Sequence, residues 1–183
     1  MGGTGTLKAV LFDRDGTLVV DVPYNGDPQL VRPMDGAFAA LQKVRGAGLA
    51  TGVVSNQSGV ARGLLTLDQV TSVNRKVEQV LGPFDVWEIC PHGPGDGCEC
   101  RKPAPGMILA ACRRLGITPD ETAFIGDIGA DIEAATAAGS RAVLVPTPVT
   151  RQEEIDAAEW VALDLGQAVE MLLENTAEQD VPA

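Results

Sequence analysis

Residues 8–17, KAVLFDRDGT, decide the fold of this chain, because a short apolar run ends there on two acidic residues one position apart. Residues 10–12 have the length and composition of a buried strand, and a polar turn rich in Asp and Gly follows them. Asp13 and Asp15 therefore stand where open α/β sheets place their reacting groups. One carboxylate of such a pair can attack or bind a metal while the other moves a proton. A solvated turn would have the same composition, so the interpretation needs support from the rest of the chain.

Length and composition predict one globular domain covering residues 1–183, with flexible ends over residues 1–6 and 176–183. Hydrophobic residues make up 45% of the chain and charged residues 21%, which is ordinary for a globular protein. The formal net charge of −11 argues against nucleic acid or an anionic membrane as a partner, because no basic face can be assembled. No apolar run approaches the roughly 20 residues that span a bilayer. We expect a monomer.

The N-terminus and the cysteines both point to a cytoplasmic location. The opening MGGTGTLK has no hydrophobic region of the kind that a secretory signal needs. Three of the four cysteines crowd into one short loop beside the only histidine, unlike a disulfide framework spread over a secreted domain. A reducing compartment is therefore the expected setting.

Strands alternate with helices along the chain. Strands are expected at residues 10–12, 50–54, 84–89, 122–125 and 141–145. A helix with Asp35 as its N-cap should run to Ala47, with Phe38, Leu41 and Val44 inward. Further helices should follow Thr66, which forms a capping box with Gln69, and then Pro105, the GDIGAD motif and residue 153. This alternation predicts an α/β fold with a doubly wound, mainly parallel sheet and helices on both faces.

Polar motifs stand at the ends of three of these strands. DRDGT follows the first, SNQSG follows the second, and GDIGAD follows the fourth; Arg101 and Lys102 come after the third candidate strand. Each motif alone could be a turn, a helix cap or a solvated cation. In a doubly wound sheet, however, these strand ends meet at one edge, and their joint placement there favours a shared site.

The four motifs together resemble those of the haloacid dehalogenase superfamily of phosphatases. In that superfamily an Asp-x-Asp follows the first strand, then come a Ser or Thr, a Lys and an acidic pair. The corresponding positions in this chain, in the same order, are Asp13/Asp15, Ser55, Lys102 and Asp127/Asp131. The resemblance covers most of the chain and implies a haloacid dehalogenase-like fold without a large cap domain.

The resemblance also implies a mechanism. Asp13 would be the nucleophile and form an aspartyl-phosphate, while Asp15 would act first as general acid and then as general base. Ser55 and Lys102 would hold the phosphoryl oxygens.

Magnesium is the first cofactor that the resemblance implies. It would be held by the carboxylates of Asp13 and Asp127 and by the backbone carbonyl of Asp15, in the oxygen coordination that this cation prefers. Asp131 would support that shell.

Cys90, His92, Cys98 and Cys100 predict a second metal site. Their C-x-H-x5-C-x-C spacing supplies three thiolates and one imidazole, a closed set typical of structural zinc. Incidental free thiols near a surface histidine are the plainer alternative. The loop between them offers no apolar residue to bury, so a metal would hold it in one shape and fix Arg101 and Lys102, which follow directly. Cys112 stands apart, on an apolar helical stripe, and is expected in the core.

The zinc loop and SNQSGVARG narrow the resemblance to the histidinol-phosphate and heptose-bisphosphate phosphatases. That branch implies substrate contacts from two segments and one cation, which are Asp21, Val22, Pro23 and Tyr24, then Asn56, Gln57 and Ser58, and Arg101. Two features depart from the heptose enzymes. Val19 replaces a common Asn, and the x5 spacing resembles the histidinol-phosphate enzymes.

Two substrates and one other class of protein stay open. A sugar bisphosphate needs a second phosphate pocket, for which Arg101, Arg14 and Arg62 are candidates. Histidinol phosphate carries an amine, which Asp21 or Asp27 could bind. A small phosphorylated metabolite, with a sugar bisphosphate favoured, is the expected partner. A non-catalytic phospho-acceptor module is the alternative class, but it would not need Asp15 two residues beyond its acceptor.

Overall fold

The computed structural model describes residues 5–179, and its centre is one five-stranded parallel sheet in the order β3-β2-β1-β4-β5. The strands are β1 (Ala9–Phe12), β2 (Ala50–Asn56), β3 (Val86–Cys90), β4 (Thr122–Gly126) and β5 (Arg141–Leu144). Each neighbouring pair is parallel, so all five carboxyl ends lie at the same edge. The predicted α/β class and parallel sheet are confirmed.

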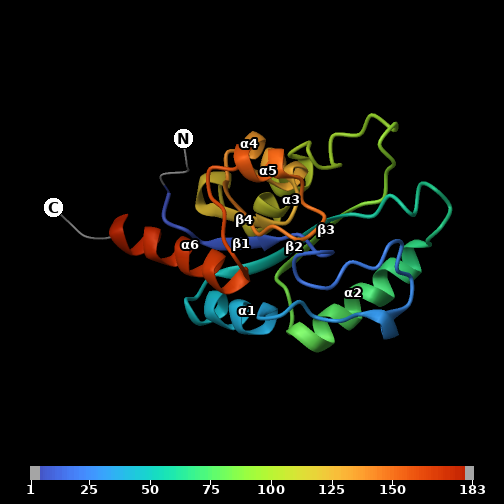
Figure 1. The fold of residues 1–183 in the computed structure, drawn as a ribbon, viewed down its shortest axis with the longest axis horizontal. Coiled ribbons are helices and arrows are strands. Elements are labelled where there is room, and N and C mark those ends of the chain that lie inside the picture. Colours follow the sequence, from blue (N-terminus) through green and yellow to red (C-terminus); the bar gives the residue numbers. More distant parts are fainter. Residues whose placement is uncertain (1–4, 180–183) are drawn as a thin grey trace.

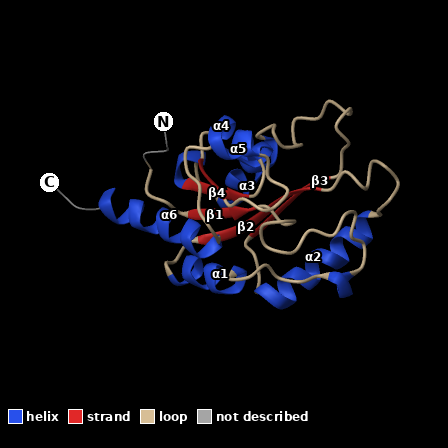
Figure 2. Cartoon of the chain, in the orientation of Figure 1, coloured by secondary structure: helices blue, strands red, loops and turns tan. Residues whose placement is uncertain are grey.

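Helices cover both faces of this sheet (Figure 1). One layer holds α1 (Ala37–Gly46), α2 (Leu67–Leu81) and α6 (Leu165–Gln179), and the other holds α3 (Gly106–Leu115), α4 (Gly129–Ala138) and α5 (Gln152–Ala157) (Figure 2). Two short 3-10 turns, η1 (Pro28–Leu30) and η2 (Pro119–Glu121), lie in the connections. No separate cap domain is present among the described residues.

Strand β1 is buried along its whole length because both faces of the sheet are covered. Val10 and Phe12 pack into the core under α1 and α6, whereas Leu11 packs into the core under α3 and α4. Successive side chains of a strand point to opposite faces, so a strand covered on both sides needs a continuous apolar run. That requirement explains the AVLF sequence that ends at the acidic motif.

Helix α1 differs from the prediction in its start and in its buried face. Its N-cap is Gly36, with φ of 77°, and not Asp35. Phe38, predicted to point inward, is 54% exposed, whereas Leu41 is fully buried. The buried positions are Ala37, Ala40, Leu41 and Val44, an i, i+3, i+4, i+7 set to which Phe38 does not belong.

Other boundaries agree closely with the predictions. Thr66 and Gln69 form the predicted capping box at the start of α2. Strand β3 begins at Val86 and not at residue 84, because its pairing with β2 starts there, at Gly52 and Val86. Phe84 instead packs edge-on against Trp87 in the core. Helix α6 continues to Gln179, past the predicted tail start, and residues 1–4 and 180–183 lie outside the described residues. None of the described helices combines the length and apolar character that a bilayer crossing needs.

The corrected face of α1 can be tested with two single substitutions. Leu41→Ala should lower the free energy of unfolding by about 2–5 kcal/mol, because it leaves a cavity in a fully buried position. Phe38→Ala should lower it by less than about 1 kcal/mol, because that ring is mostly in water. Urea denaturation of both variants measures the difference. Equal losses would contradict the observed face.

Candidate active site

The sequence-predicted strand-end residues line one cavity of about 360 Å³ at the carboxyl edge of the sheet. Asp13 and Asp15 follow β1, Ser55 closes β2, and Asp127 follows β4. The predicted residues that line the cavity are Asp13, Asp15, Asp21, Val22, Pro23, Tyr24, Ser55, Asn56, Gln57, Ser58, Arg101, Lys102 and Asp127. The structure therefore brings together side chains that lie more than a hundred positions apart in the sequence.

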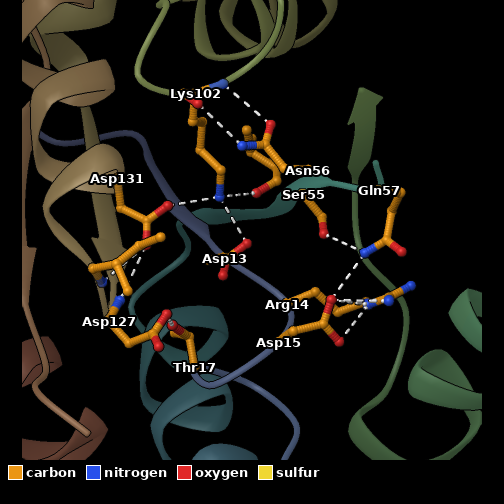
Figure 3. A network of polar contacts seen from close by, with 12 residues as sticks. Asp13, Arg14, Asp15, Thr17, Ser55, Asn56, Gln57, Lys102, Asp127 and Asp131 are labelled. Carbon is orange, nitrogen blue, oxygen red and sulfur yellow. Dashed lines mark hydrogen bonds and ion pairs between the residues drawn. The ribbon is translucent and has the colours of Figure 1, made fainter. Parts of the chain in front are cut away.

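Lys102 lines this cavity and is almost entirely buried. Figure 3 shows its contacts with the surrounding residues. Its ammonium is 2.7 Å from Asp13 Oδ1 and 2.7 Å from Asp131 Oδ1, and it donates to the carbonyl of Val54 at 2.9 Å. Burial acts to lower the pKa of Lys102, but the two carboxylates outweigh it and raise the pKa above its ordinary value. Lys102 therefore stays charged and links three strand ends.

Asp13, Asp127 and Asp131 form a buried cluster in which one carboxylate oxygen from each residue lies within 4.8 Å of the other two. Burial raises the pKa of Asp13 well above its ordinary value, and Asp131 and Asp127 add to the rise while Lys102 opposes it. Burial and the charge of Asp131 raise the pKa of Asp127 to about 7. Such crowding of carboxylates is unfavourable unless a cation shares the space.

The donor set fits magnesium. Both oxygens of Asp131 are engaged, one by Lys102 and the other by the backbone N–H groups of Asp127 and Ile128. Asp13 Oδ2 and Asp127 Oδ2 accept no side-chain hydrogen bond within the described part of the chain, so each can serve as a ligand. Hard carboxylate oxygens of this kind are what Mg²⁺ prefers.

Two glycines allow the carboxylates to approach so closely. Gly16 has φ of 81°, and a Cβ there would lie 2.4 Å from Asp127 Oδ2. A Cβ on Gly126 would lie 2.4 Å from the Asp131 side chain. Thr17 adds a hydrogen bond to Asp127 Oδ1 at 3.3 Å. The Gly residues of DRDGT and GDIGAD are thus needed for space around the acidic cluster.

Asp15 is held from two sides. Arg14 donates to it from Nε at 3.1 Å and from Nη2 at 2.9 Å, and Gln57 Nε2 donates to it at 2.8 Å. The sequence suggested Arg14 as a ligand for a second phosphate. Arg14 does line the cavity, but its Nε, Nη1 and Nη2 all donate to protein acceptors. Its side chain is 1% exposed, and its third described partner is Asn74 Oδ1.

Asn56 anchors the backbone of Lys102. Its Oδ1 accepts from the Lys102 N–H at 3.1 Å, and its Nδ2 donates to the Lys102 carbonyl at 3.1 Å. In the SNQ motif, Ser55 faces the cavity, Asn56 holds Lys102, and Gln57 holds Asp15. Sequence reasoning assigned both amides to the substrate and missed these contacts, because they depend on loops that the sequence pattern does not place.

Cys90, His92, Cys98 and Cys100 converge as the spacing predicted. The Cys90 sulfur lies 3.1 Å from that of Cys100 and 3.8 Å from that of Cys98, and His92 Nδ1 lies 3.2 Å from the Cys100 sulfur. A tetrahedral zinc site has sulfur–sulfur edges of about 3.8 Å and sulfur–nitrogen edges of about 3.5 Å, given its usual bond lengths. The four donors therefore fit zinc.

Several cavity residues were missed, and two suggested ones lie elsewhere. The lining residues that were missed are Asn25, Gly59, Ile128 and Val149. Val149 belongs to a Pro- and Thr-rich loop with no periodic signal. Arg62 and Asp27 do not line the cavity: Arg62 lies over the exposed ring of Tyr24, and Asp27 caps η1.

Fold and site together define a phosphatase of the haloacid dehalogenase type, and a family model described as HAD-hydrolase-like matches residues 99–168. A D-glycero-beta-D-manno-heptose-1,7-bisphosphate 7-phosphatase of Yersinia pestis is 37% identical over 172 residues, covering 86% of this chain and 91% of the relative. The enzyme of that name from Escherichia coli K12 is 36% identical, covering 90% and 94%. The chain belongs to this heptose-bisphosphate phosphatase family, which confirms the resemblance seen in the sequence.

A solved structure supports the same grouping. The D,D-heptose 1,7-bisphosphate phosphatase of B. bronchiseptica, crystallised with magnesium and phosphate, superimposes with a TM-score of 0.81 at 30% identity. The match covers 92% of this chain and 99% of that one. That enzyme's magnesium agrees with the oxygen donors found here.

The zinc assignment predicts one zinc ion per purified chain. Cys98→Ser should lower the zinc content severalfold, because a hydroxyl is a far weaker ligand than a thiolate. Cys112→Ser is the matched control: Cys112 is buried against Thr122, outside the cluster, so zinc should be retained. Elemental analysis by mass spectrometry gives the ratio. A zinc-free wild-type protein would refute the assignment.

Proposed function

We propose that this protein removes the 7-phosphate of D-glycero-β-D-manno-heptose 1,7-bisphosphate through an aspartyl-phosphate on Asp13. The observation that carries the proposal is the cavity in which Asp13, Asp15, Ser55 and Lys102 converge. The three relatives described above are all named as heptose-bisphosphate phosphatases, which supports the choice of substrate.

Asp13 is the nucleophile in this proposal. One oxygen of the Asp13 carboxylate attacks phosphorus and displaces the C7 oxygen of the sugar, while Lys102, which binds Oδ1, offsets part of the negative charge of that carboxylate. Asp15 gives its proton to that oxygen as the phosphorus–oxygen bond breaks. Asp15 then takes a proton from water, which attacks the phosphorus and releases inorganic phosphate, so that both carboxyl groups regain their starting forms.

Ser55 and Lys102 hold the phosphoryl oxygens. Gln57 Nε2 donates to Ser55 Oγ at 2.9 Å, so the hydroxyl proton of Ser55 is free to point toward an anion. Lys102 contributes a buried positive charge, which acts strongly in surroundings that exclude water.

Magnesium would be held by the carboxylates of Asp13 and Asp127 and by the main-chain carbonyl of Asp15. When bound, it neutralises part of the negative charge that otherwise separates the phosphate from the carboxylates. Asp131 orients Lys102 and the backbone of Asp127, which suits a supporting role.

The residues proposed to select the substrate line the same cavity as the catalytic groups. Arg101 is proposed to bind the second phosphate, with Asp21, Val22, Pro23, Tyr24, Asn56, Gln57 and Ser58 around the sugar. Histidinol phosphate is the second candidate, favoured by one observation: Asp21 lines the same cavity and could bind an amine.

We further propose that residues 1–183 act as a monomeric, single-domain enzyme in the cytoplasm. Two cores share one sheet within the described residues, as in a single domain. None of the four cysteines forms a disulfide, as expected in a reducing compartment.

Replacement of either catalytic carboxylate should abolish phosphate release. Asp13→Asn removes the nucleophile and Asp15→Asn removes the proton donor, so each should lower kcat at least about 10³-fold. Asp27→Asn is the matched control, because it makes the same change outside the cavity and keeps an oxygen that can cap η1. Phosphate release and circular dichroism are measured on all three. Substantial turnover by Asp13→Asn or Asp15→Asn would refute the mechanism.

The substrate assignment predicts a preference that steady-state kinetics can measure. With magnesium present, kcat/KM for the heptose bisphosphate should exceed that for histidinol phosphate by at least about 100-fold, since a phosphate that binds a placed cation contributes several kcal/mol. Arg101→Ala should reduce this ratio, because it removes the proposed ligand of the second phosphate. A preference for histidinol phosphate would reverse the assignment.

A further inference from the structure

Arg14 is the largest fully buried side chain in the described part of the chain, and it lies between the two acids of the first motif. It contacts Asp15 through both Nε and Nη2, at 3.1 and 2.9 Å. A guanidinium that meets a carboxylate through two nitrogens fixes the plane of that carboxylate as well as its distance. Figure 3 shows this contact together with that of Gln57.

Asn74 connects the guanidinium to helix α2. Its Oδ1 accepts a hydrogen bond from Arg14 Nη1 at 2.7 Å, across 60 positions of sequence. The helix itself is firmly placed, because Val73 and Val77, on either side of Asn74 in the sequence, are buried in the core. Arg14 therefore fixes Asp15 relative to a helix that is itself held firmly in the core.

Gln57, which directly follows the neighbouring strand β2, completes the support. Its Nε2 donates to Asp15 Oδ2 at 2.8 Å, and Arg14 Nη2 donates to the same oxygen. Asp15 Oδ1 receives only the longer contact from Arg14 Nε. The oxygen with spare capacity to carry a proton is therefore Oδ1.

We propose that Arg14 and Asn74 are positioning residues that hold Asp15 so that its Oδ1 faces the leaving oxygen of the substrate. This inference rests on the proposed phosphatase mechanism. Stability alone does not account for the arrangement, because a buried ion pair adds little compared with apolar packing of the same volume. Geometry does account for it, since misplacement of a reacting group by about 1 Å can cost 10²-fold in rate.

The test compares two leaving groups in variants of Asn74. Asn74→Leu and Asn74→Ala remove the acceptor for Arg14, Asn74→Asp keeps an oxygen in its place, and Ser72→Ala is an exposed control on the same helix. The substrates are the heptose bisphosphate, whose alkoxide needs a proton to leave, and p-nitrophenyl phosphate, whose phenolate does not. The value of kcat/KM reports on substrate binding and the first phosphoryl transfer, and not on the later hydrolysis of the aspartyl-phosphate.

Loss of positioning should lower kcat/KM for the heptose bisphosphate, which is an alkyl phosphate ester, and should leave p-nitrophenyl phosphate almost unaffected. In Asn74→Leu and Asn74→Ala, kcat/KM for the heptose bisphosphate should fall about 10- to 100-fold, within the range of general acid catalysis, while that for p-nitrophenyl phosphate changes less than about threefold. Asn74→Asp should recover most of the loss, and Ser72→Ala should behave as wild type. Equal losses on both substrates, or no loss, would overturn the positioning role.

A crystal structure of Asn74→Ala separates this inference from the proposed function. Displacement of Arg14 and of the Asp15 carboxylate, together with the selective loss on the heptose bisphosphate, supports the positioning role. An unmoved Asp15 overturns it. A wild-type protein that hydrolyses neither substrate overturns the proposed function instead.

Discussion

The ammonium of Lys102 is the interaction on which the rest of the site depends. It binds Asp13 after β1, Asp131 at the start of α4 and the carbonyl of Val54 in β2. Carboxylates are costly to bury unless they are paired and hydrogen-bonded, so two of them can approach so closely only around this cation. One nitrogen atom thereby fixes the relative positions of three motifs that the sequence keeps far apart.

The position of Lys102 depends in turn on its own loop. Asn56 holds its backbone from both sides, and the cysteine loop enters it directly from the preceding residues. Between Cys90 and Cys98 the loop consists of Pro, Gly, Asp and the single His, with no apolar side chain to bury. Hydrophobic packing cannot order such a segment. A zinc ion on the four converging donors can, and it would carry that order to the catalytic cation.

Whether a feature of the structure can be predicted from the sequence depends on how far apart along the chain the interacting residues are. The strands and the acidic motifs were predictable, because local periodicity places them and a parallel sheet brings their ends together. In α1 the prediction was right for Leu41 and Val44 and wrong for Phe38, which is apolar but lies off the buried stripe. The contact between Arg14 and Asn74 also could not be predicted from the sequence. It joins residues 60 positions apart through side-chain geometry that no local pattern encodes.

The site carries more negative charge than its own cations balance, and this excess connects stability to function. Without a divalent ion, the pKa of Asp127 is raised from 3.8 to about 7, so the folded chain holds a proton that the unfolded chain releases. In the absence of a divalent ion, the free energy of unfolding must therefore fall as the pH rises from about 4 to 7. A divalent ion that binds the folded chain reverses this loss and stabilises it by mass action. The crowding that weakens the empty fold is therefore what favours magnesium, and magnesium in turn allows a phosphate to enter.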